Sequence, residues 1–204
     1  MTTSIQAVIF DVGGVLLRTP SRATRQAWEA RLGLPDGGLD GLVFESTAGQ
    51  AAQRGEMTDA DLWQWLGQHL GLTNHDLRVL YRDFWAGDVL DHGLIDMVAS
   101  LRHRYHTAII SNATDHLMHT LQVTYPTVAP AFDLIVCSAS EGLMKPEAEI
   151  YYRTLQRLNC PPAAAVFVDD NQDNVRAAHT IGLKAIHFQP TVDLPAVFAQ
   201  LGVV

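Results

Sequence analysis

The sequence has few cysteines, no cluster of basic residues and no long apolar run, and each absence removes a class of protein. Of its 204 residues only Cys137 and Cys160 are cysteines, and neither lies in a CxxC or CxxH pattern, so no disulfide framework or zinc site is expected. The net charge of −8, without any Lys/Arg cluster, argues against binding to nucleic acid. No run reaches the roughly 18 apolar residues of a membrane span, and no signal peptide precedes the first strand, so we expect a cytoplasmic protein without a membrane partner.

Near its start the sequence has a short apolar run that we expect to form a buried strand ending in a carboxylate. The apolar run 7–10 stops at Asp11, and Gly13 and Gly14 follow closely. A strand would hold the carboxylate in place, and the glycines would let backbone N–H groups approach a ligand. We therefore expect this stretch to form part of a functional site.

Between Arg18 and about Asp88 the sequence shows helical periodicity and no strand signal. The expected helices cover 23–32 and 39–53, and two more begin at Thr58 and Thr73, each followed three residues later by an Asp as in a capping box. The segment also holds all four tryptophans, Trp28, Trp63, Trp65 and Trp85. This composition favours a small helical bundle packed with aromatic side chains, although Trp63, which lies off the main apolar stripe, is also a candidate for facing a ligand.

After Asp91 strands and helices alternate. The expected strands are 5–10, 107–110, 133–136, 165–168 and 184–188, and the expected helices are 93–104, 115–123, 147–158, 172–180 and a last one that contains Leu194, Val197, Phe198 and Leu201. Such alternation is typical of an α/β protein with a parallel sheet covered on both faces. We therefore divide the chain into a core, 1–17 and 89–204, and an inserted all-helical domain, 18–88.

Polar residues follow several of these strands. Asp11, Ser111 and the pair Asp169–Asp170 stand at strand ends, and Lys145 lies just beyond the third strand. In a parallel sheet these ends meet at one edge. The set suits phosphoryl transfer through an aspartyl phosphate: Asp11 attacks phosphorus, Asp11 and Asp170 hold a divalent cation, and Ser111 and Lys145 bind the phosphoryl oxygens.

Each of these residues also has a simpler structural explanation. Ser111 and Asp170 would serve as helix caps, and Lys145 would be a solvated loop lysine. The adjacent Asp169 and Asp170 would repel each other without a cation, which favours a metal site. Asn174 is equally consistent with a partner of a carboxylate or metal-bound water and with a helix-surface residue.

Four motifs, in this order, resemble those of the haloacid dehalogenase (HAD) superfamily of hydrolases. They are Phe10-Asp11-Val12-Gly13-Gly14-Val15, Ile109-Ile110-Ser111-Asn112, Lys145-Pro146 with Tyr151, and Val168-Asp169-Asp170-Asn171 with Asn174. The resemblance covers the whole chain and implies a doubly wound, Rossmann-like core with strand order 5-4-1-2-3 and a helical (C1-type) cap over the site.

The resemblance also implies roles for individual residues. Asp11 would be the nucleophile, and Mg²⁺ would be held by Asp11, Asp170 and the backbone carbonyl of Gly13. Phosphate would be bound by Gly13, Gly14, Ser111, Asn112 and Lys145, with Asp169 and Asn174 in support. The substrate would be a small phosphorylated molecule.

The sequence departs from the family pattern at Gly13. Typical phosphatases of the family have a second Asp two residues after the nucleophile, which protonates the leaving oxygen and then activates water. A glycine cannot do either, and general acid–base help is worth on the order of 10²–10⁴ in rate.

Three hypotheses remain open. The first, which we favour because both metal carboxylates are present, is a Mg²⁺-dependent phosphatase for substrates with good leaving groups, such as sugar 1-phosphates or acyl phosphates, or one whose acid is Glu45, Glu56 or Asp115. The second is a 2-haloacid dehalogenase, since halide leaves without protonation. The third is a catalytically weak phosphate-binding or regulatory protein.

The helical cap is expected to select the substrate, because it covers the site and varies, whereas the catalytic residues beneath it are shared. Arg22 and Arg54 are candidates for contacting a second anionic or polyol part of that substrate. His116 and His119 lie one helical turn apart, and we assign them no role. A monomer and a homodimer are equally consistent with the sequence.

Overall fold

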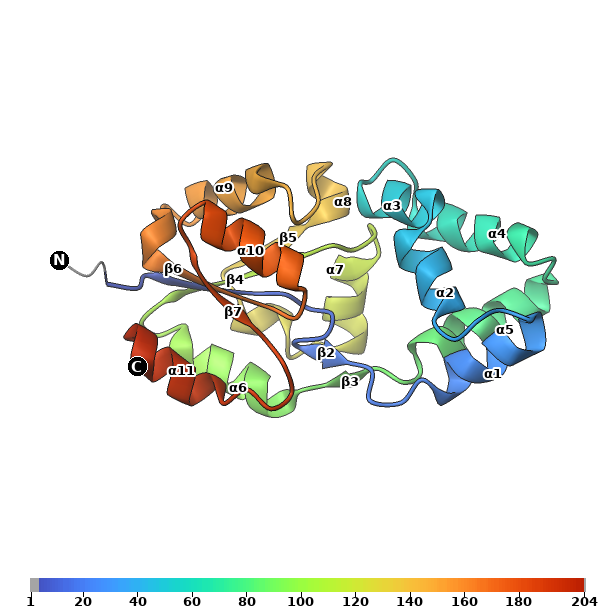
Figure 1. The fold of residues 1–204 in the computed structure, drawn as a ribbon, viewed down its shortest axis with the longest axis horizontal. Helices are drawn as coiled ribbons and strands as arrows, with labels where there is room; N and C mark the ends of the chain where they lie inside the picture. The colour runs from blue at the N-terminus through green and yellow to red at the C-terminus, as the bar shows by residue number, and fades with distance from the viewer. Residues whose placement is uncertain (1–3, 204) are drawn as a thin grey trace.

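The computed structural model describes residues 4–203 of the chain. Its centre is a five-stranded parallel sheet in the order β5-β4-β1-β6-β7 (Figure 1). The strands are β1 (Ala7–Phe10), β4 (His106–Ser111), β5 (Leu134–Cys137), β6 (Ala165–Asp169) and β7 (Lys184–His187). Counting these core strands along the chain gives 3-2-1-4-5, which is the expected order read from the other edge.

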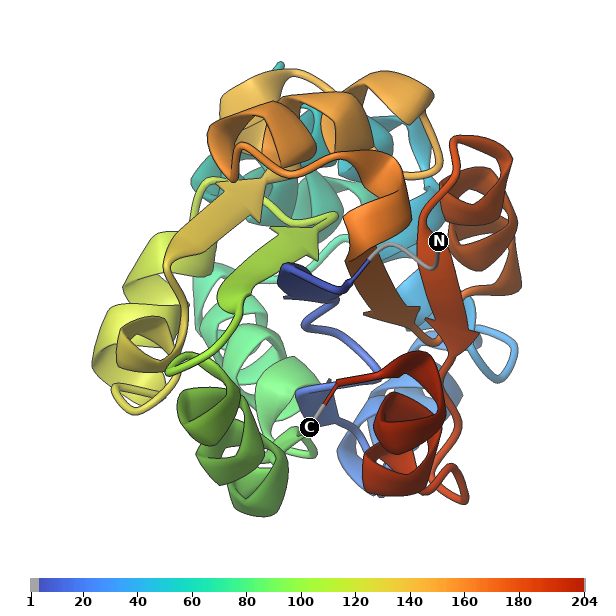
Figure 2. The same ribbon diagram turned by 90° about the vertical axis from the view of Figure 1, so that its left-hand side faces the viewer.

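Helices cover both faces of the sheet, as expected for such alternation (Figure 2). On one face, Val8 and Phe10 pack with residues of α6 (His92–Leu101) and α11 (Leu194–Leu201). On the other, Ala7 and Ile9 pack with α9 (Ala148–Arg157) and α10 (Gln172–Thr180). Because β1 is buried from both sides, its carboxyl end is rigidly placed.

Shorter helical segments connect these elements. They are α7 (Leu117–His119), which continues as a π-helical turn (Thr120–Thr124), α8 (Ser138–Glu141), and 3₁₀ turns at Ala129–Ala131 and Pro162–Ala164. The expected helix 115–123 is therefore wrong in detail: it begins two residues later and its second half is wound more loosely.

Residues 18–88, called the cap below, form a helical bundle beside the carboxyl ends of the strands (Figure 1). Its helices are α1 (Ala23–Leu32), α2 (Gly38–Asp40) with a π-helical turn (Gly41–Glu45), α3 (Thr47–Gln53), α4 (Asp59–His69) and α5 (Asn74–Trp85). Its apolar core is a cluster of its own, with Trp28 and Trp63 buried in it. The expectation of aromatic packing is confirmed, and Trp63 is part of that core.

Two sequence predictions inside the cap need correction. The expected helix 39–53 is broken at Ser46, whose backbone is extended and whose hydroxyl accepts a hydrogen bond from the Gly49 N–H at 3.0 Å. Serine competes with the helical backbone for hydrogen bonds, and therefore favours a cap over a helix interior. A second difference is a short antiparallel ribbon of β2 (Leu17–Arg18) and β3 (Val89–Leu90), where the chain enters and leaves the cap.

The predicted caps of two helices are confirmed. Thr58 and Thr73 cap α4 and α5, each accepting a hydrogen bond from the N–H three residues on. Cys137 and Cys160 are buried free thiols. Within residues 4–203, no helix combines the length and the apolar character that a membrane crossing requires.

Candidate active site

The carboxyl ends of three neighbouring strands bring together the residues that the sequence singled out. Asp11 follows β1, Ser111 ends β4 and Asp169 ends β6, and the β-ladder aligns Phe10 with both Ile109 and Val168. Lys145 reaches this edge from the loop before α9. Its Nζ lies 2.8 Å from Asp11 Oδ1 and 2.7 Å from Asp169 Oδ2.

Burial of this cluster sets its electrostatics. Burial raises the pKa of Asp11 to about 7, with the charge of Asp169 adding to the rise and Lys145 opposing it. Burial alone would lower the pKa of Lys145. The charges of Asp11 and Asp169 outweigh this effect and raise the pKa. Lys145 is therefore charged at neutral pH, and Asp11 is held close to its titration point.

Asp169 is fully engaged by protein groups. Its Oδ1 accepts hydrogen bonds from the Asn171 N–H at 2.8 Å and the Asn174 amide at 3.1 Å, and its Oδ2 accepts from Lys145 and again from Asn174. Asn174 is buried, and its backbone carbonyl oxygen accepts a hydrogen bond from the Tyr151 hydroxyl at 3.1 Å. Asn174 thus supports the Asp169 carboxylate and is not a surface residue.

Gly14 and Asp170 lie against each other. The backbone of Gly14 has a φ of +72°, and a Cβ there would overlap the Asp170 carboxylate. A side chain at position 14 is therefore excluded both by the left-handed backbone and by the carboxylate. Burial and the neighbouring charge of Asp169 raise the pKa of Asp170, and the His187 ring nitrogen lies 2.8 Å from the Asp170 carbonyl oxygen.

The carboxylates of Asp11, Asp169 and Asp170 fit a hard divalent cation. One oxygen from each lies within 4.8 Å of the others, and Lys145 is the cation that contacts two of them. Three carboxylates against one ammonium leave an excess of negative charge that a divalent cation would balance, and oxygen donors are the ligands that Mg²⁺ prefers. Since protein groups already occupy both oxygens of Asp169, Asp11 and Asp170 are the better ligands.

Asn112 holds the backbone of Lys145. Its Oδ1 accepts the Lys145 N–H at 2.8 Å, and its Nδ2 donates to the Lys145 carbonyl oxygen at 2.8 Å. The side chain therefore fixes where the Lys145 loop meets β4, a role that its position in the motif did not indicate. Phosphate binding by Asn112 stays a prediction.

The two arginines proposed as substrate contacts are engaged elsewhere. Arg22 forms ion pairs with Asp36, Glu29 and Asp40, all within the cap. Arg54 pairs with Glu147 of the core at 2.5 Å, so it joins the cap to the loop after Lys145.

The three candidate acids are exposed. Glu45 and Glu56 lie on the cap, and Asp115 follows the β4 motif. The Asp115 Oδ1 accepts a hydrogen bond from the Asp59 N–H at 2.8 Å. Asp115 therefore has a structural contact across the interface, whereas nothing in the structure singles out Glu45 or Glu56 as a proton donor.

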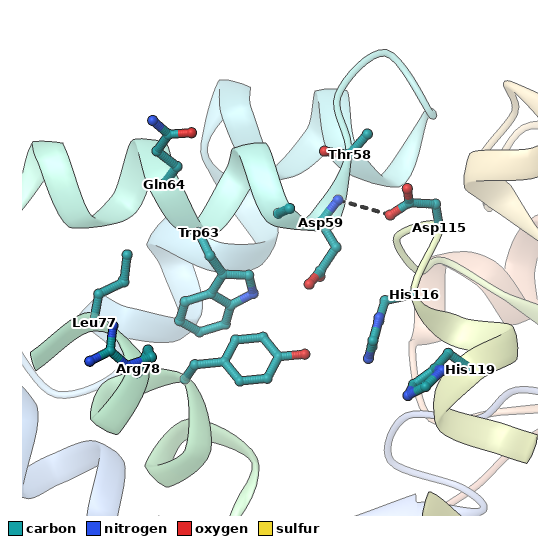
Figure 3. Close-up of a pocket in the computed structure, with 11 residues that line it drawn as sticks. Thr58, Asp59, Trp63, Gln64, Leu77, Arg78, Asp115, His116 and His119 are labelled. Atoms are coloured by element: carbon teal, nitrogen blue, oxygen red, sulfur yellow. Dashed lines mark hydrogen bonds between the residues drawn. The ribbon is translucent and has the colours of Figure 1, made fainter. Parts of the chain in front are cut away.

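A pocket between the cap and the core is lined by Trp63, which the sequence offered as a candidate for facing a ligand, and by residues that the sequence did not assign. Asp59 and Trp63 line it from α4, Tyr81 from α5, and His116 and His119 from the core (Figure 3). The signal available in the sequence was the histidine pair directly after the Ser111-Asn112 motif. The sequence alone does not show that the cap meets the core there.

Comparisons with known proteins agree with the fold and the motifs. The family profile of haloacid dehalogenase-like hydrolases matches residues 5–182. The sesquiterpene phosphatase astK of Aspergillus oryzae is 26% identical over 92% of this chain and 91% of its own length. D-ribitol-5-phosphate phosphatase of Bacteroides thetaiotaomicron is 24% identical over 91% and 92% of the two chains.

The fold is also found among solved structures. A HAD family enzyme of Bacteroides thetaiotaomicron, in complex with magnesium and inorganic phosphate, superposes with a TM-score of 0.78 at 20% identity, over 96% of this chain and 100% of that one. Fold, motif order and the family profile over most of the chain lead to one conclusion: the protein belongs to the haloacid dehalogenase-like hydrolases.

Proposed function

We propose that the protein is a Mg²⁺-dependent phosphatase that acts on a small phosphorylated metabolite through an aspartyl phosphate on Asp11. The observation that carries the proposal is the buried cluster in which Lys145 bridges Asp11 and Asp169 while Asp170 lies within metal-binding range. Two of the relatives above are phosphatases by name, which supports the same reaction class.

Each group in the cluster has a distinct task in this proposal. A carboxylate oxygen of Asp11 forms a bond to phosphorus while the bond between phosphorus and the leaving oxygen breaks. Lys145 and the Ser111 hydroxyl bind the phosphoryl oxygens and balance the charge that develops on them. Mg²⁺, held by Asp11, Asp170 and the Gly13 carbonyl, would neutralise the incoming dianion. Water then attacks phosphorus, which releases phosphate and restores Asp11.

Gly13 limits the substrates. Without a side-chain acid at this position, the leaving oxygen must depart with little help, which favours acyl phosphates and sugar 1-phosphates over simple alkyl phosphates. Gly13 is also compatible with the dehalogenase hypothesis, since a halide leaving group needs no proton and therefore no general acid.

We further propose that residues 1–17 and 89–204 form the catalytic domain and that 18–88 form its substrate-selecting cap. The β2–β3 ribbon stands where the two would join. The cytoplasmic location and the choice between monomer and homodimer stay predictions of the sequence.

The test is phosphate release from acetyl phosphate, sugar 1-phosphates and p-nitrophenyl phosphate with Mg²⁺, beside chloride release from 2-chloro acids. We expect phosphate release that EDTA abolishes and that Asp11→Asn lacks. Phosphate release no faster than in Asp11→Asn would contradict the proposal, and chloride release in its place would favour the dehalogenase.

A further inference from the structure

The loop that follows β4 begins where the sheet stops pairing. The parallel ladder between β4 and β5 ends at the pair of Ser111 and Cys137. Ser111, whose hydroxyl is proposed above to bind a phosphoryl oxygen, is therefore the last residue that the neighbouring strand holds. The backbone groups beyond it need hydrogen-bond partners from elsewhere, and those partners decide how firmly the end of β4 is placed.

Ser138 supplies such partners to Ala113. It comes directly after β5, and it is completely buried. Its hydroxyl oxygen accepts a hydrogen bond from the Ala113 N–H at 2.9 Å, and the hydroxyl donates to the Ala113 carbonyl oxygen at 3.1 Å. A hydroxyl can fill both roles because it carries one donor and two acceptor positions. One side chain therefore satisfies both backbone groups of Ala113.

A contact of the same kind runs in the opposite direction. Asn112, on the loop after β4, bonds both the N–H and the carbonyl oxygen of Lys145. Ser138, in turn, begins α8 and the segment that leads to Lys145. Each of the two loops thus holds the backbone of the other through one side chain. Together, Asn112 and Ser138 connect the segment that carries the Ser111 hydroxyl to the segment that carries the Lys145 ammonium.

We propose that Ser138 is a positioning residue for phosphoryl transfer: by fixing the backbone of Ala113, it sets the place of the Ser111 hydroxyl relative to the Lys145 ammonium. The inference rests on the proposed phosphatase function. The Ser138 hydroxyl is engaged by both backbone groups of Ala113, so it acts through Ser111 and not on the substrate.

The placement matters because Ser111 and Lys145 must meet the same phosphoryl group. Donors that are held in place before the substrate binds need no rearrangement as charge develops, and a displacement of about 1 Å can cost on the order of 10²-fold in rate. Ser138 takes no part in the ion pairs of Lys145 with Asp11 and Asp169. Its loss should therefore disturb the binding of the phosphoryl oxygens and leave the metal site intact.

The experiment measures kcat and KM for acetyl phosphate, the Mg²⁺ concentration that gives half of the maximal rate, and unfolding in urea. The test variant is Ser138→Ala. If it does not fold, Ser138→Cys replaces it, since a thiol has a similar shape and forms weaker hydrogen bonds. The matched control is Thr107→Val near the other end of β4, where a completely buried hydroxyl donates to the Ala131 carbonyl oxygen at 2.9 Å.

A second pair of variants asks whether Ser138 acts through Ser111. Ser111→Ala removes the hydroxyl that Ser138 is proposed to place, and Ser111→Ala with Ser138→Ala removes both. If Ser138 acts only by placing that hydroxyl, its loss has little left to change once the hydroxyl is gone, so the two effects on kcat should not multiply.

We expect kcat to fall at least about tenfold in Ser138→Ala, and by less in Ser138→Cys, while the Mg²⁺ requirement keeps its wild-type value. Thr107→Val should lose a comparable amount of stability and keep the wild-type kcat. In the Ser111→Ala background, the further change Ser138→Ala should alter kcat by less than about threefold.

Two results would overturn the inference and leave the phosphatase standing. One is a wild type that hydrolyses acetyl phosphate while the folded Ser138 variant keeps the kcat of Thr107→Val. The other is a loss from Ser138→Ala that is as large without the Ser111 hydroxyl as with it. If the wild type releases phosphate from no phosphate compound, both the positioning role and the phosphatase are wrong.

Discussion

Gly13 occupies a place in the site where a side chain would fit. Its φ lies outside the left-handed region, and among the described residues nothing lies within 4 Å of a Cβ built there. Gly14, by contrast, has both a left-handed backbone and the Asp170 carboxylate against it. The structure therefore requires glycine at position 14. At position 13 a side chain would fit, so the effect of the missing side chain can be tested by substitution.

Gly13→Asp is expected to add the missing proton shuttle. We predict that kcat for an alkyl phosphate rises by on the order of 10² or more, and that kcat for acetyl phosphate rises less, because only the opening of the aspartyl phosphate by water, and not the departure of the leaving group, gains from the new acid–base group. Steady-state kinetics with both substrates measure the effect. Gly13→Asn has the same size without a titratable proton, so equal rates in the two variants would show that no shuttle was installed.

The raised pKa of Asp11 predicts how the metal-free protein responds to pH. In the unfolded chain this carboxyl titrates near 3.8 and in the folded protein near 7, so the folded state binds more protons between these values. The free energy of unfolding should therefore fall as pH rises through this window. Urea unfolding in EDTA at pH 5 and pH 8 measures the fall.

Asp11→Asn isolates the contribution of this one group, because asparagine does not titrate. The variant should lose less stability than the wild type between the two pH values. Mg²⁺, if it binds the ionised carboxylate as proposed, should stabilise the wild type more at pH 8 than at pH 5. An identical pH dependence in both proteins would assign the effect to other carboxyl groups.

Residues at strand ends were predictable from the sequence for a physical reason. A parallel sheet brings every carboxyl end to one edge, so Asp11 and Asp169 had to meet once the alternation of strands and helices was recognised. The contacts of Asn112 with the Lys145 backbone were not predictable, because they depend on how two loops approach each other.

Among the helices, the caps at Thr58 and Thr73 were predicted from the sequence, whereas the break at Ser46 was not. The capping boxes at Thr58 and Thr73 involve neighbours three residues apart, which the sequence displays directly. The break at Ser46 was missed because apolar periodicity continues through it. Serine there ends one helical segment and caps the next, and only its backbone conformation reveals the change.

Gly55 is the point where the loop after α3 meets the core. Its φ is +73°, and a Cβ would overlap the carbonyl oxygen of Ala139 in α8. Gly71 has a similar φ of +64°, but among the described residues nothing lies near its Cβ. A side chain at either position would therefore meet the same backbone strain, and the two positions differ in their contact with the core.

Gly55→Ala should disturb the packing of the cap against the core, and Gly71→Ala should not. Both should lose about 1 kcal/mol of stability from the left-handed backbone. Gly55→Ala should lose a further 1–3 kcal/mol from overlap, and its KM for the phosphate substrate should rise. Urea unfolding and KM measure the two effects. Equal values in both variants would mean that this contact does not position the cap.

For the whole molecule, the sheet was easier to predict than the position of the cap. Strand order followed from the family resemblance, whereas the cap meets the core through pairs far apart in sequence, such as Asp59 with Thr114 and Arg54 with Glu147. The Arg54–Glu147 pair is partly exposed and is worth at most about 1 kcal/mol. This distance in sequence is why the pocket containing His116 was missed.

Mass spectrometry of the acid-quenched protein, after mixing with acetyl phosphate and Mg²⁺, tests whether Asp11 accepts the phosphoryl group. Because Gly13 cannot activate the water that opens the aspartyl phosphate, we predict that the phosphoryl group accumulates on the peptide containing Asp11. Accumulation should disappear without Mg²⁺ and decline in Gly13→Asp. If the protein hydrolyses acetyl phosphate while the Asp11 peptide never carries a phosphoryl group, Asp11 is not the nucleophile.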